Sequence, residues 1–180
     1  MLLQDNCRVF SEPHQAQIGL RFPFLVVESK GGAAGGNMIG AQNQAAVDGA
    51  CALNILSDLQ SAVEHITSRP DYVQYTKGSI TKEQEGNRLP PLLFSVTTEG
   101  PLHEIWVHCR VGEAYHMTCH RAWRTTRHED TKEFVQTLAK IVDWGKKRFR
   151  ESVLMALKRI EGPVLGGILG SLDEGSTMDQ

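Results

Sequence analysis

Hydrophobic positions change their spacing along the chain, and each spacing predicts a different element. From residue 17 to residue 29 apolar side chains are nearly continuous, which predicts a buried strand. From residue 38 to residue 66 they recur every three or four positions, which predicts a long helix. Many small residues lie within 38–66, so this helix is expected to pack closely against a sheet.

After Pro91 the apolar positions alternate with polar ones, which is the period of a strand. Three strands are predicted, at residues 92–98, 103–111 and 115–123. The last two form a hairpin whose turn is expected at Gly112-Glu113-Ala114. When the apolar faces of this hairpin are matched, His108 is expected opposite Thr118.

Helical spacing returns between residues 131 and 160, and Gly162-Pro163 predicts the end of that helix. Residues 161–180 are rich in glycine and acids and predict a flexible tail. The order is strand, helix, three strands and helix. It indicates one α/β domain over residues 1–160, with a mixed sheet flanked by helices.

Composition narrows the class of protein. The chain has 180 residues, of which 41% are hydrophobic and 22% charged, as is usual for one globular domain. No apolar run is long enough to span a membrane, and the N-terminus does not resemble a secretory signal. The four cysteines are widely spaced and are expected to be free thiols, so an intracellular protein is predicted.

The stretch Glu28-Ser29-Lys30 is the first candidate for chemistry. Residues two apart on a strand point to the same face, so Glu28 and Lys30 are expected side by side where the buried strand ends. A surface ion pair is one interpretation. The other is half of a metal-dependent site, where a carboxylate binds a cation and a lysine lies beside the phosphate.

FPFLVVESKGG at residues 22–32, followed by AQNQAA at residues 41–46, resembles the PD-(D/E)XK nuclease-like domain. The likeness is strongest to a group of fungal proteins with that domain, and it covers roughly residues 12–160. It implies a restriction-endonuclease-like fold, with Glu28 as a metal ligand and Lys30 as the catalytic lysine. It also implies that Gln42 or Gln44 brings a polar side chain towards the site.

That family expects an aspartate upstream of the strand, and this chain has His14 in its place, with Glu12 nearby. The resemblance therefore implies Mg²⁺ or Mn²⁺ held by Glu28 with His14 or Glu12 completing the site. A histidine suits the softer cation better. Few residues precede Glu28, so a partner copy is expected to supply missing strands, which predicts a homodimer.

Charge is unevenly distributed. The net charge is −2, but residues 110–159 contain 12 basic and 6 acidic residues. Three arginines there, Arg121, Arg124 and Arg127, are candidates for contacting a nucleic-acid backbone. A solvated helix face is the alternative interpretation of such a basic segment.

Three functions follow from these residues. The first is a metal-dependent phosphodiesterase that acts on nucleic acid. The second is a catalytically inactive relative that serves as a dimeric binding or assembly module. The third is an enzyme on a small molecule, which would use a sheet face lined by His108, His116 and His120.

Overall fold

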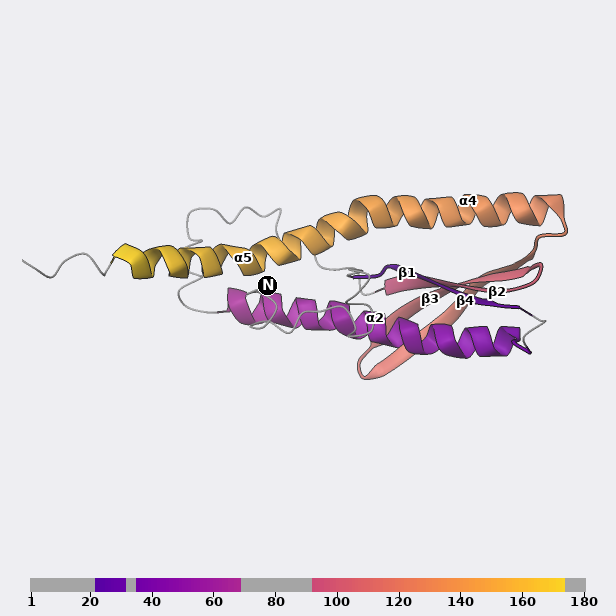
Figure 1. Ribbon diagram of the computed structural model, residues 1–180, viewed down its shortest axis with the longest axis horizontal. Coiled ribbons are helices and arrows are strands. Elements are labelled where there is room, and N and C mark those ends of the chain that lie inside the picture. The colour runs from indigo at the N-terminus through magenta and orange to yellow at the C-terminus, as the bar shows by residue number, and fades with distance from the viewer. Residues whose placement is uncertain (1–21, 32–34, 69–91, 174–180) are drawn as a thin grey trace, which may run out of the picture.

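The computed structural model describes residues 22–31, 35–68 and 92–173, with side chains as far as Glu161. A four-stranded mixed sheet lies between helices on its two faces (Figure 1). The predicted α/β class, with a mixed sheet flanked by helices, is confirmed. The elements are β1 (Leu25–Lys30), α2 (Met38–Thr67), β2 (Leu92–Glu99), β3 (Leu102–Val111), β4 (Ala114–Arg124), α4 (His128–Trp144), the π-helical turn η4 (Gly145–Phe149) and α5 (Arg150–Asp173).

The strands follow one another across the sheet in the order β1-β2-β3-β4. β1 pairs with β2 in parallel because α2 carries the chain back along the sheet between them. The two later pairings are antiparallel. All the predicted strands form; the first begins at Leu25 within the described residues, and the predicted residues 17–21 lie outside them.

The β3–β4 hairpin differs from the prediction by one residue. Its turn has two residues, Gly112 and Glu113, and Gly112 has a φ of 59°. Two-residue hairpin loops of one common type reserve this first position for glycine. His108 therefore lies opposite Met117, and the expected pairing with Thr118 is wrong because it assumed a three-residue turn.

Helix α2 begins where two side chains accept hydrogen bonds from its first turn. The Asn37 side chain accepts from the Gly40 amide at 2.8 Å, and the Glu99 carboxylate accepts from the Met38 amide at 2.6 Å. Of the small residues predicted to face the sheet, Ala45, Gly49 and Ala52 are buried, whereas Ala50 is half-buried and Ala46 is exposed.

Helix α4 covers the opposite face of the sheet from α2, and α5 continues it beyond the sheet beside the second half of α2 (Figure 1). Two cores result. Between the sheet and α4, Trp123 and Ile141 are buried with residues of β2 and β3. Between α2 and α5, Leu59 and Phe149 belong to a larger apolar cluster.

The final helix does not stop where the sequence predicts. Gly162-Pro163 lie inside α5, which continues to Asp173, so the predicted end is wrong. Apolar residues recur in the sequence after Pro163, and one missing backbone donor does not end such a helix. Residues 174–180 lie outside the described residues. Among those described, no helix is long and apolar enough to cross a membrane.

Candidate metal site at the sheet edge

Glu28 and Lys30 lie on the same face of β1, as predicted. Both side chains are half-buried. Val27, which precedes Glu28, and Ser29, which separates the two, are exposed on the other face. α2 packs against β1 on the face that carries Glu28 and Lys30. Because β1 is the edge strand of the sheet among the described residues, this pair of side chains lies between the sheet and α2 and is only half-buried.

Asp48, which the sequence analysis did not select, joins Glu28 from α2. Burial raises the pKa of Glu28, and a hydrogen bond with the Asp48 carboxyl group and its negative charge raise this pKa further. The positive charge of Lys30 partly opposes these effects. Two carboxyl groups from different elements therefore meet beside one lysine.

Lys30 forms a hydrogen bond with Gln44, which lies one helical turn before Asp48 on α2. Its Nζ atom donates a hydrogen bond of 2.6 Å to the side-chain oxygen of Gln44. Residues four apart lie on the same side of a helix, so Gln44 and Asp48 face β1 together. Of the two glutamines selected from the sequence, Gln44 is the one that contacts Lys30.

Gln42 has a different role from Gln44. Its side-chain amide donates at 2.8 Å to Oε2 of Glu104 on β3, which also accepts from Thr97 Oγ1 at 2.9 Å and Trp106 Nε1 at 3.1 Å. This group of four residues, the Glu104 cluster, fills the space between α2 and the middle of the sheet. The cluster fixes α2 over the sheet, and Gln42 does not reach Glu28 or Lys30.

The three histidines do not form a common site. His108 is 2% exposed, and its Nε2 lies 2.8 Å from Ser95 Oγ. His116 pairs with Cys109 and therefore lies on the opposite face from His108, while His120 is exposed at the strand irregularity near Trp106. The expected histidine-lined face is wrong, because the two-residue turn moves His116 to the other side.

His108 is packed directly against α2. A Cβ atom at Gly49 would lie 2.2 Å from His108 Nδ1, so only glycine allows this approach. Burial lowers the pKa of His108, which favours the neutral ring between helix and sheet. His108 is a buried structural residue.

The predicted arginines divide between the two faces. Arg121 forms an ion pair of 2.5 Å with Glu133 of α4, and Arg127 lies 3.9 Å from Asp130. Arg124 is exposed. It pairs with Leu102, which pairs with Glu99, which in turn pairs with Lys30, so Arg124 and Lys30 lie in one row across the sheet. Three strand spacings separate Arg124 from Lys30, about 15 Å along the same end of the sheet.

The other predicted ligands, Glu12 and His14, lie outside the described residues. Within the described part of the chain, no group of three or more His, Cys, Asp or Glu side chains could hold a metal ion. The donor set there is the pair of carboxylates, Glu28 and Asp48. Mg²⁺ fits such a pair, because it commonly binds one or two carboxylates and keeps several waters or substrate oxygens.

Residues 3–157 match the model of a protein family described as a domain of unknown function, DUF7924. The chain belongs to this family. No curated protein and no solved structure matches the chain. The family's description assigns no chemistry.

Proposed function

We propose that the protein is a metal-dependent phosphodiesterase that cleaves nucleic acid inside the cell, with its site at the exposed end of β1. The observation that carries the proposal is the meeting of Glu28 and Asp48 beside Lys30. Glu28 and Asp48 would hold Mg²⁺ or Mn²⁺, which when bound would polarise a phosphate oxygen and lower the pKa of a water.

The chain's own residues would position the phosphate. Lys30 carries a positive charge towards the carboxylate pair, and its hydrogen bond to Gln44 restricts the ammonium group to one position. A fixed cation stabilises the charge that develops on the oxygens of a transferring phosphoryl group. Asp48 thus takes the place of the second carboxylate that the family resemblance expects upstream.

Nucleic acid is the substrate class that the charges favour. Arg124 lies on the same face and at the same end of the sheet as Lys30. Successive nucleotides of one strand are about 3.4 Å apart along a duplex axis. A bound strand of about five or six nucleotides would therefore reach from Lys30 to the exposed Arg124.

The test is calorimetric titration with Mg²⁺ and Mn²⁺, followed by cleavage assays on single- and double-stranded DNA and RNA with and without EDTA. Binding is expected for the wild-type protein and is expected to be lost in Glu28→Gln and Asp48→Asn. Asp58→Asn is the matched control, since Asp58 is an exposed aspartate of the same helix. Equal heats in all four proteins would refute the site.

A second candidate is a catalytically inactive binding or assembly module. The exposed apolar side chains along α5, Leu154 and Leu157, favour it. Absence of both metal binding and cleavage in a folded protein would support this candidate and exclude the first. It does not depend on Glu28, because α5 extends beyond the end of the sheet where β1 begins, and Glu28 lies towards the other end of that strand (Figure 1).

A further inference from the structure

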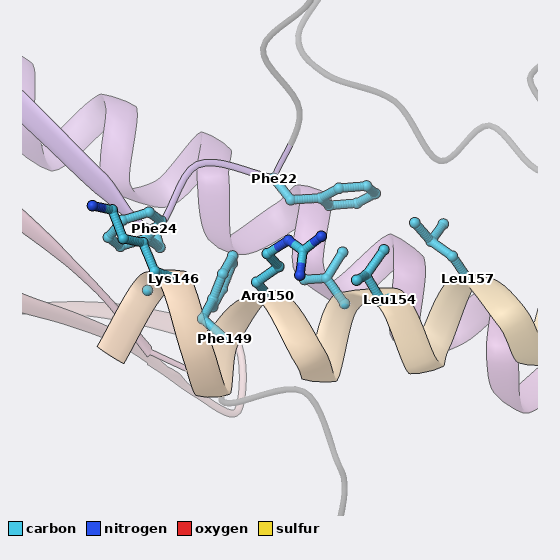
Figure 2. A pocket seen from close by; sticks show the side chains of 9 residues that line it. Phe22, Phe24, Lys146, Phe149, Arg150, Leu154 and Leu157 are labelled. Atoms are coloured by element: carbon cyan, nitrogen blue, oxygen red, sulfur yellow. The ribbon is translucent and has the colours of Figure 1, made fainter. Parts of the chain in front are cut away.

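An apolar groove lies along the start of α5, away from the carboxylate pair. Its volume is about 390 Å³, and it is lined by Phe22 and Phe24 from the segment before β1 and by Gly145, Phe149 and Val153 from η4 and α5. Figure 2 shows Arg150, Leu154 and Leu157 projecting from α5 on the side of the groove that carries Phe22. The groove therefore continues as a stripe of side chains along the helix.

The stripe contains four residues at helical spacing: Arg150, Leu154, Leu157 and Glu161. Arg150 and Glu161 are eleven residues apart, about three turns, so both lie on one side of the helix with the two leucines between them. Leu154 and Leu157 are 39% and 37% exposed, and Arg150 and Glu161 are exposed too. A basic residue therefore stands at one end of the stripe and an acidic residue at the other.

This stripe is complementary to itself when turned end to end. Its midpoint falls between Met155 and Ala156, both for the leucine pair and for the charged pair. Two copies packed antiparallel about a two-fold axis at that midpoint would place Arg150 opposite the second copy's Glu161, twice. Leu154 would lie opposite the second copy's Leu157, also twice.

We propose that this stripe, with the groove beside it, is the contact between two copies of the chain, related by a two-fold axis across α5. The arginine alone would suit many acidic partners. A second copy in the reverse direction fits the stripe best. Its acidic end then lies against the basic end of the first copy, and the leucines of the two copies meet in the middle. No residue of this contact belongs to the proposed metal site.

The test is a charge exchange measured by sedimentation velocity across the micromolar range. Arg150→Glu faces Glu161 of the second copy with a like charge, and Glu161→Arg faces Arg150 in the same way. Each single variant is expected to dimerise at least about tenfold more weakly than wild type, because two attractive pairs become repulsive. Mixing the two variants restores both attractive pairs, so an equimolar mixture is expected to regain the wild-type affinity.

Two further proteins make the result decisive. The double variant Arg150→Glu with Glu161→Arg is expected to dimerise like wild type, because both pairs are reversed together. Arg148→Glu removes the same charge from a position that does not line the groove and is expected to change nothing. A wild-type chain that is monomeric throughout, as expected if another segment of the chain covers the groove, would overturn the proposal, and so would dimerisation that the single variants do not weaken.

Discussion

The carboxyl groups of Glu28 and Asp48 meet although one belongs to a strand and the other to the third turn of the helix that follows it. Burial and the contact with Asp48 raise the pKa of Glu28 above its usual value of 4.5. Such a pair is costly to the folded chain when both groups are ionised. The cost becomes useful where a cation binds, since the same two charges then attract it.

Asp48→Asn is expected to stabilise the protein near neutral pH. The raised pKa means that the folded state binds more protons than the unfolded state above pH 4.5, so stability falls as pH rises through that window. Asparagine removes the like charge and can still donate a hydrogen bond to Glu28. Denaturant unfolding should show a gain of about 0.5 kcal/mol at pH 7. The gain should disappear below pH 4.5, and an equal gain at both pH values would contradict this account.

Gln44→Leu is expected to reduce nucleic-acid cleavage about tenfold or more while leaving metal affinity within about twofold. Leucine fills similar space but cannot accept the hydrogen bond that fixes the Lys30 ammonium group. Asn43→Leu, which replaces an amide side chain at the neighbouring exposed position, is the matched control. A parallel loss of metal binding in Gln44→Leu would show that this residue acts through folding of the site.

Glu104→Ala is expected to destabilise the fold by about 2–3 kcal/mol. Three donors, from Gln42, Thr97 and Trp106, share its Oε2 atom and would be left without that acceptor. Glu104→Gln keeps one oxygen in place and should recover part of the loss. Urea unfolding of the three proteins checks the order, and a loss below about 0.5 kcal/mol in Glu104→Ala would contradict the proposed role.

Gly49→Ala is expected to cost about 2–4 kcal/mol or to prevent folding, because its Cβ would lie 2.2 Å from the His108 ring. Gly40→Ala in the same helix meets only Asn37 Oδ1, at 3.4 Å, and should be neutral or slightly stabilising. Thermal unfolding distinguishes the two variants. Equal melting temperatures would mean that α2 sits further from β3 than the structure indicates.

The neutral state of His108 makes part of the stability depend on pH. Its pKa is lowered in the folded protein, so the unfolded chain binds the proton first as pH falls below 6.5. This contribution is complete above pH 6.5 and is lost progressively below it. The free energy of unfolding of His108→Asn should therefore fall less steeply between about pH 6.5 and 5 than that of the wild-type protein.

Local pattern was enough to predict the shared face of Glu28 and Lys30, because a strand alternates its side chains whatever surrounds it. Asp48 was missed because its contact with Glu28 spans twenty residues and depends on how α2 is rotated over β1. The buried small residues Ala45, Gly49 and Ala52 mark the face of α2 that meets the sheet, and Asp48 borders that face. A charged residue that borders the small-residue face of such a helix is therefore the sequence signal for a group near the sheet.

The errors have equally local causes. One residue fewer in the turn at Gly112 reverses the faces of β4 relative to β3, so His116 lies on the opposite face of the sheet from His108. At the other end of the domain, apolar residues continue at helical spacing on both sides of Pro163, and the helix runs through it. The nuclease resemblance itself remains a prediction, which the metal titration tests.

The π-helical turn Gly145–Phe149 joins two helices that serve separate cores. Residues 141, 145, 149 and 153 recur at intervals of four, and such a row would drift around a regular helix of about 3.6 residues per turn. The wider turn absorbs the drift at the point where Gly145 admits the Phe24 ring. The π-helical turn therefore determines how α5 is rotated about its axis relative to α4. Lengthening or shortening it by a residue would rotate α5 by about 100°, which would turn Val153, Ala156 and Ile160 away from α2 together with the stripe.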